Sequence, residues 1–152
     1  MKNTMLEMTR YAALARQAVA EGVVLLKNEA VLPLAPGGRA ALFGYAQFHY
    51  YKSGTGSGGL VNVTHVPEIL GGDGGYRLDA EVQARYAAWL ADHPYEMGTG
   101  WAQEPWFQPE MPLDEEFVRA AAQRADTAFI VIGRTAGEDQ DNTNTPGSFL
   151  LT

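Results

Sequence analysis

Residues 114–133 read DEEFVRAAAQRADTAFIVIG and predict a helix that leads directly into a strand. Asp114 can cap a helix over 115–125, because a carboxylate accepts hydrogen bonds from the free N–H groups of a first turn. Asp126 ends this helix. The apolar run 127–133 that follows is the clearest strand in the chain. We expect this helix and strand to form one unit of a layered α/β fold.

Three further elements precede that stretch. Residues 39–44 form a short apolar run between turn residues and predict a second buried strand. Residues 78–90 predict a helix, and residues 6–27 predict a longer one, because small and apolar residues recur there at helical spacing. Gly22 weakens the end of the longer helix, so residues 23–26 could instead leave it as a strand.

This order of helices and strands predicts an α/β fold with a mainly parallel sheet. Two convincing strands are fewer than the about five to six strands of an average sheet. We therefore expect the 152 residues to hold only part of a larger α/β domain.

The composition excludes several classes of function. A formal net charge of −7 argues against a nucleic-acid partner, which needs clustered Lys and Arg. The chain has no cysteine, so disulfides and thiolate chemistry are excluded. It has neither an apolar run long enough for a membrane span nor the apolar stretch of a signal peptide at its start. We expect a cytoplasmic protein with no membrane partner.

Two loops are the candidates for chemistry, because ligands of open α/β sheets bind at the carboxyl ends of the strands. The first loop follows Gly44. The second follows Gly133 and brings Arg134, Glu138, Asp139 and Asp141 close together in the sequence. A carboxylate there could act as a general acid, or the segment could be a solvated acidic turn. The residues alone leave both readings open.

Cofactor and metal sites find little support in the sequence. Gly54, Gly56 and Gly59 satisfy the spacing G-x-G-x-x-G, but a dinucleotide fingerprint should follow its strand at once and open a helix. The spacing of the three histidines, His49, His65 and His93, suits no zinc site, and the residues around Asp139 match a calcium loop only in part. We expect no cofactor and no metal.

The long segment 92–112 is rich in aromatic residues and proline and shows no period. A compact domain seldom keeps such a loop without a use for it. Trp101, Trp106 and Phe107 could stack on sugar rings or could pin the loop to the body of the domain.

Four segments in the same order resemble the α/β sandwich domain of glycoside hydrolase family 3, whose best-known members are β-glucosidases. They are 15–34 (ARQAVAEGVVLLKNEAVLPL), 41–44 (ALFG), 51–63 (YKSGTGSGGLVNV) and 125–147 (ADTAFIVIGRTAGEDQDNTNTPG). The resemblance implies that residues 1–152 are the N-terminal part of an (α/β)6-type sandwich, truncated after roughly half of the domain. It also implies a member with reversed domain order, whose nucleophile-bearing barrel domain is absent from this chain.

The resemblance implies site residues as well. Glu138 matches the position of the catalytic acid/base, and Ser57 and Thr55 lie in a loop that reaches the sugar. Arg134 is the further substrate-binding candidate. The sequence departs from better-known members directly after Glu138, at residues 139–142 (DQDN), which leaves Asp139 or Asp141 as alternative acids.

The implied activity is retaining hydrolysis of terminal β-linked sugars, with no cofactor, and with the acid/base half of the site on this chain. The substrate would be a β-linked oligosaccharide or glucoside, and the partner the missing barrel of the same polypeptide. We expect the isolated chain to be inactive. The alternatives are a non-catalytic fragment that binds carbohydrate or a partner domain, and a nucleotide-binding domain built on Gly54–Gly59.

Overall fold

The computed structural model of the chain describes residues 7–49, 69, 75–100, 103, 105–134 and 141–151. The chain divides into two compact units, Met1–Leu34 and Ala35–Thr152. No helix among the described residues is long and apolar enough to cross a membrane.

The first unit contains one helix, α1 (Met8–Gly22), none of whose residues is buried. The helix ends at Gly22, so the predicted extension to Lys27 is wrong. Val23 is already extended, with φ −72° and ψ 127°, and valines 23 and 24 are β-branched residues that disfavour a helix. The alternative strand is wrong as well, because residues 23–28 are assigned to neither helix nor strand.

The second unit is built on a parallel sheet with the strand order β2-β1-β3. Its strands are β1 (Arg39–Phe43), β2 (Arg77–Leu78) and β3 (Thr127–Ile130). Ala40 lies opposite both Leu78 in β2 and Thr127 in β3. The predicted α/β fold with a parallel sheet is therefore confirmed. Strand β2 was not predicted, because two residues are too few to show a period.

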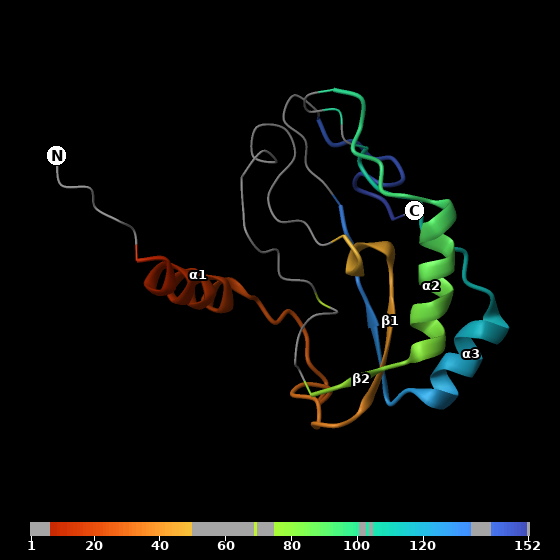
Figure 1. Cartoon of the computed structure of the whole chain (residues 1–152), viewed down its shortest axis with the longest axis horizontal. Coiled ribbons are helices and arrows are strands. Elements are labelled where there is room, and N and C mark those ends of the chain that lie inside the picture. Colours follow the sequence, from red (N-terminus) through yellow and green to blue (C-terminus); the bar gives the residue numbers. More distant parts are fainter. Residues whose placement is uncertain are drawn as a thin grey trace. The chain divides into compact units, whose positions relative to one another are not determined.

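Two helices of this unit lie on the same face of the sheet, as Figure 1 shows. They are α2 (Ala80–Asp92) and α3 (Glu115–Arg124), and both lie within about two residues of their predicted bounds. Asp114 caps α3 as predicted, since its side chain accepts a hydrogen bond from the Phe117 N–H at 2.8 Å. The core between these helices and the sheet consists of Ala41, Phe43, Val82, Tyr86, Met111, Phe117 and Ala121.

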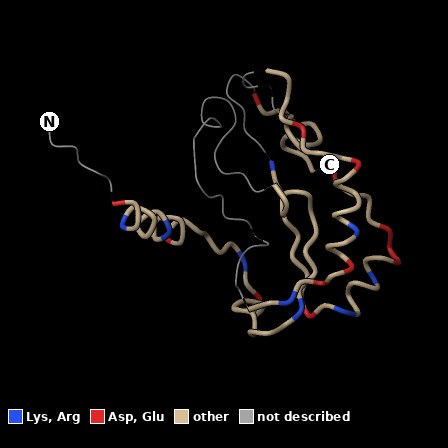
Figure 2. Tube along the Cα trace, in the orientation of Figure 1, with Lys and Arg blue, Asp and Glu red and all other residues tan. Residues whose placement is uncertain are grey.

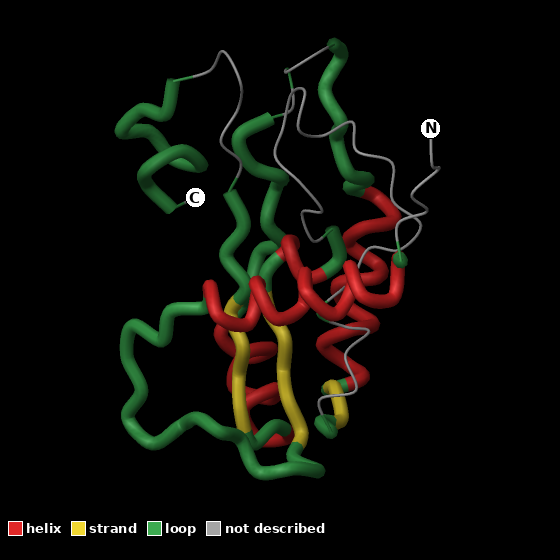
Figure 3. The backbone as a smooth tube through the Cα atoms, turned by 90° about the vertical axis from the view of Figure 1, so that its left-hand side faces the viewer, coloured by secondary structure: helices red, strands yellow, loops and turns green. Residues whose placement is uncertain are grey.

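Strand β1 is the central strand and is buried on both of its faces. Its residues Ala40–Phe43 are at most 8% exposed. Strand β3 differs, since Ile130 is 74% exposed and Ile132, just beyond the strand, is 61% exposed. The two strands run side by side and their following loops leave from the same end of the sheet (Figure 3). That end is where a ligand of a parallel sheet is expected.

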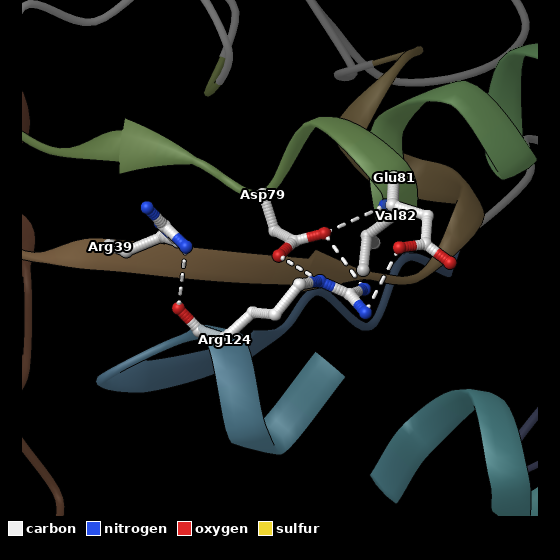
Figure 4. Close-up of polar contacts among 5 residues, drawn as sticks. All are labelled: Arg39, Asp79, Glu81, Val82 and Arg124. Carbon is white, nitrogen blue, oxygen red and sulfur yellow. Dashed lines mark hydrogen bonds and ion pairs between the residues drawn. The ribbon is translucent and has the colours of Figure 1, made fainter. Parts of the chain in front are cut away.

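Charged residues lie at the opposite, amino-terminal end of the sheet and along α2 and α3 (Figure 2). Asp79, which is 3% exposed, caps α2 by accepting the Val82 N–H at 3.0 Å. The Arg124 guanidinium, at the end of α3, binds both carboxylate oxygens of Asp79, at 2.8 and 3.1 Å (Figure 4). This bidentate pair joins the start of α2 to the end of α3.

Further contacts tie this ion pair to β1. The Arg39 guanidinium donates to the Arg124 carbonyl at 3.2 Å, and Arg124 also pairs with Glu81 at 3.0 Å (Figure 4). The hydrogen bond from Arg124 is the main reason that the pKa of Asp79 is lowered. Burial opposes this effect and the Val82 N–H adds to it. The folded state therefore favours the ionised form of Asp79.

We predict that Asp79→Ala destabilises the second unit by at least about 1 kcal/mol, because it removes a helix cap and leaves Arg124 without its buried partner. Asp79→Asn keeps a cap oxygen and should lose less. Since the pKa of Asp79 is lowered in the folded state, its contribution is present above the ordinary value of 3.8 and is lost as the pH falls through the lowered value. Thermal unfolding of the chain at several pH values measures both effects.

Asp92→Asn is the matched control, because Asp92 is exposed at the far end of α2. It should leave the unfolding temperature nearly unchanged. If Asp79→Ala unfolded at the same temperature as this control, the ion pair would not stabilise the unit.

We also predict that the 152-residue chain alone associates in solution. Exposed apolar side chains beside a strand edge favour pairing between copies. Replacing Ile130, at the exposed edge, by Lys should reduce the mean mass measured by light scattering, whereas Ala91→Lys, on an exposed position of α2, should not. A monodisperse monomer at all concentrations would contradict this prediction.

Candidate functional site

The candidate site lies at the carboxyl ends of β1 and β3, where a cavity of about 410 Å³ opens. Its wall includes Gly44 and Tyr45 from the end of β1, Gly133 and Arg134 from the segment after β3, and Glu110 from the loop before α3. The volume is that of an ordinary small-molecule site, about 300–1,000 Å³. Most of the wall is apolar, with few polar groups.

Gly44 brings the exits of the two strands together. Its φ is 103°, in the region that favours glycine, and a Cβ added there would collide with the Val131 carbonyl oxygen. The Val131 N–H donates to the Phe43 carbonyl at 2.9 Å, so the backbones remain paired up to this turn. No other residue type could let β1 leave the sheet this close to β3.

Two side chains bind the backbone N–H groups of this turn. The Gly44 N–H donates to the Tyr86 hydroxyl oxygen at 2.7 Å, and the Tyr45 N–H donates to Glu110 Oε2 at 2.9 Å. Gln47 adds two more hydrogen bonds, since its amide donates to the carbonyls of Leu42 and Gly44, both at 3.0 Å. The short 3-10 helix η1 (Tyr45–Gln47) is therefore fixed from α2 and from the loop before α3.

The environment shifts the pKa of both acidic groups in this cluster. Burial raises the pKa of the Glu110 carboxyl, and the Tyr45 N–H offsets part of the rise. Burial also raises the pKa of the Tyr86 phenol, against the effect of the Gly44 N–H and with a contribution from the charge of Glu110. The phenol stays neutral, and the carboxyl holds its proton to a higher pH than a free glutamate does.

Aromatic rings form one side of the site. The ring of His49 lies 5.4 Å from that of Tyr45 and 4.7 Å from that of Tyr95, measured between centroids. Phe107 packs directly on Gly147, where a Cβ would collide with its ring. Phe107 therefore joins the long loop to the segment after β3. This contact agrees with the predicted role of pinning the loop to the body of the domain. Trp101 lies outside the described residues.

Most of the predicted site residues cannot be placed. Glu138, Asp139, Ser57 and Thr55 lie outside the described residues, and so does the glycine pattern Gly54–Gly59. Their predicted roles stay predictions.

Arg134 is described; it is exposed, lines the cavity and donates hydrogen bonds to backbone carbonyls. Its Nη1 donates to the Phe149 carbonyl at 2.8 Å and to the Ser148 carbonyl. Ser148 is 2% exposed, and its hydroxyl accepts the Thr143 N–H at 2.9 Å. Arg134 thus anchors the segment 141–151 beside the cavity, which the sequence did not predict. Asp141 belongs to the same segment and is exposed.

The two described histidines make aromatic contacts. His93 stacks on Trp89 with 3.4 Å between ring centroids and also approaches the Trp89 carbonyl at 2.9 Å. Within the described part of the chain, no three His, Cys, Asp or Glu side chains gather into a possible metal site.

The sequence did not predict that Glu110, Tyr86 and Gln47 hold the backbone after β1. A single acidic residue in the irregular stretch QPEMP carries no period or motif. Tyr86 and Val82 are one helical turn apart and both buried, so Tyr86 would be taken for an ordinary core residue. Only the hydrogen bonds to the β1 exit distinguish it.

Comparison with known proteins identifies related chains. The family model for the glycosyl hydrolase family 3 C-terminal domain matches residues 23–148. A β-glucosidase from Ruminococcus albus is 50% identical over 149 residues, which are 97% of this chain and 16% of that protein. β-Glucosidase A from Butyrivibrio fibrisolvens is 37% identical over 137 residues, which are 87% of this chain and 16% of that protein.

Solved structures agree with these matches. A β-glucosidase from Paenibacillus barengoltzii is similar with a TM-score of 0.87 and 46% identity, over 93% of this chain and 16% of that one. β-Glucosidase 3B from Thermotoga neapolitana, in complex with glucose, is similar with a TM-score of 0.82 and 32% identity, over 95% of this chain and 21% of that one. This chain thus spans only a sixth to a fifth of the length of these relatives, and it belongs to glycosyl hydrolase family 3, in the region of the family's C-terminal domain.

Proposed function

We propose that this chain supplies the acid/base half of a retaining β-glycosidase that hydrolyses terminal β-linked glucosides. The observation that carries the proposal is the match to the family over residues 23–148, together with relatives named β-glucosidases at 50% and 37% identity. The (α/β)6-type sandwich would continue in the longer polypeptide, whose barrel domain would supply the nucleophile. We propose a cytoplasmic location for the whole protein.

The site geometry supports this proposal in one respect. Gly133 and Arg134 line the cavity, and Glu138 follows them within a few residues along the chain. Arg134 is held by the Ser148 and Phe149 carbonyls, so the segment that contains Glu138 starts from a fixed point. A loop anchored in this way can present a carboxyl group to a pocket completed by another domain.

The proposed mechanism has two steps. An aspartate of the barrel attacks the anomeric carbon, while protonated Glu138 gives its proton to the departing glycosidic oxygen. Glu138, now ionised, then removes a proton from water, which attacks the glycosyl-enzyme and releases the sugar with its β-configuration retained. The two carboxyl groups must lie about 5 to 5.5 Å apart. Ser57 and Thr55 would bind hydroxyl groups of the sugar.

We predict that Glu138→Ala in the full-length protein lowers kcat on an unactivated β-glucoside about 10²- to 10⁴-fold, because the departing oxygen loses its proton donor. The glycosylation step should be slowed far less for a substrate with a good leaving group, such as 2,4-dinitrophenyl β-glucoside. Added azide should restore turnover of that substrate and yield a β-glycosyl azide. Glu138→Gln should show the same dependence on the leaving group.

Glu116→Ala is the control, because Glu116 is an exposed residue of the first turn of α3. It should keep the activity of the unaltered protein. Unchanged activity of Glu138→Ala would exclude Glu138 as the acid. Rescue by azide of an alanine variant at Asp139 or Asp141 would assign the acid/base role to that aspartate. No activity of the unaltered protein on any β-glycoside would overturn the proposed function.

A further inference from the structure

The face of β3 that points toward the helices is largely uncovered among the residues that the structure describes. In the parallel pairing, Ala41 of β1 lies opposite Ala128, and Phe43 lies opposite Ile130. Residues that pair in neighbouring strands project from the same face of the sheet. Phe43 belongs to the core that α2 and α3 cover, so Ile130 lies on the helix side as well. Ile130 is nevertheless 74% exposed.

The uncovered region extends beyond Ile130. Ile132, two positions further along the chain, is 61% exposed, and alternate residues of an extended chain lie on one face. Leu113, just before α3, and Val118, within it, are 45% and 40% exposed. All four side chains line the same cavity. Leu113, Val118, Ile130 and Ile132 are called the aliphatic surface below.

The aliphatic surface adjoins the established core. Phe43, the pairing partner of Ile130, packs edge-on against Phe117 with 6.4 Å between ring centroids. Val118 directly follows Phe117 in α3. The layer between sheet and helices therefore continues from the core to the aliphatic surface. A sugar is a poor occupant, because the four side chains offer no hydrogen-bond partner to its hydroxyl groups. An apolar protein segment fits better.

The path of the chain indicates which element would cover this surface. From β2 the chain passes through α2 and α3, on one face of the sheet, to β3 (Figure 1). The strand order β2-β1-β3 means that this connection crosses β1. Crossover connections between parallel strands are nearly always right-handed. A second connection of the same hand that continues in the same direction from β3 must use the same face. A helix in it would lie on Ile130 and Ile132.

We propose that an amphipathic helix of the longer polypeptide, following residue 152, packs on the aliphatic surface and leads into a strand that pairs in parallel with the outer edge of β3. The helix would carry apolar residues at i, i+3, i+4 and i+7. The relatives are long enough to contain such a segment, since this chain spans 16% of the Ruminococcus albus β-glucosidase. The inference rests on the part of the proposed function that places this chain in a longer polypeptide, and it does not depend on the reaction.

The first test is cysteine labelling of Ile132→Cys and Val118→Cys in the native full-length protein. A maleimide should modify both at least about 100-fold more slowly than Ala91→Cys, because a covered side chain reacts only when the structure opens locally. Ala91 is an exposed residue of α2. Each rate is measured on the corresponding peptide by mass spectrometry and divided by its rate in denaturant. Circular dichroism confirms that each variant is folded.

The second test identifies the segment that covers the surface. Photo-leucine, a diazirine analogue close to leucine in size, is incorporated into the full-length protein and activated by light. Crosslinks from Leu113 should reach one segment that follows residue 152 and carries apolar residues at helical spacing. Light scattering should show that the crosslinked product has the mass of a single polypeptide.

Three results would overturn the inference. The first is a folded Ile132→Cys protein that is labelled as fast as Ala91→Cys. The second is protection that disappears on dilution, with crosslinks from Leu113 to a second copy, which would make the surface an interface between copies. The third is protection that appears only when a β-glucoside is bound, which would make it a ligand site. Slow labelling in a protein with no activity on any β-glycoside would support the inference and refute the proposed function.

Discussion

The burial of Ala40–Phe43 in β1 is the constraint on which the rest of the second unit depends. Four consecutive residues, Ala40–Phe43, are at most 8% exposed, so both faces and both edges of this strand must be covered. Strands β2 and β3 pair with its edges, and α2 and α3 pack on one face. Because both neighbours run parallel to β1, the loops after β1 and β3 must leave at the same end of the sheet.

The two ends of this sheet are stabilised in different ways. At the amino-terminal end a bidentate ion pair, Asp79 with Arg124, connects the start of α2 to the end of α3, and neither residue lines the cavity described above. At the carboxyl end the contacts are side chain to backbone, from Tyr86, Gln47 and Glu110. Ion pairs hold elements together, whereas hydrogen bonds to individual N–H groups set where a loop begins.

Sequence patterns predicted the regular elements well but did not predict the side chains that hold the backbone after β1. The strand within 127–133 was predicted from its apolar run, and the cap at Asp114 was predicted from helix-end chemistry. Both signals act over a few residues. The apolar period continues past Gly22, so the sequence left open whether the helix runs to Lys27 or gives way to a strand; α1 ends at Gly22 and no strand follows at residues 23–28. Glu110 was missed because its partner, Tyr45, is 65 positions away in the sequence. The bonds from Arg134 to the Ser148 and Phe149 carbonyls were not predicted, and its predicted role in substrate binding stays a prediction.

The sequence by itself determined the parallel α/β fold, the two strand ends at which a site could form, and the family resemblance that makes Glu138 and Ser57 candidates. These features depend on local periodicity and on short motifs, which need no knowledge of distant contacts. Only the tertiary structure decided that Gly44 meets Val131, that Tyr86 and Glu110 hold the backbone between them, and that Arg134 anchors the segment after β3. Such contacts join residues far apart in the chain, and they exist only once parallel pairing has brought both strand exits to one end of the sheet.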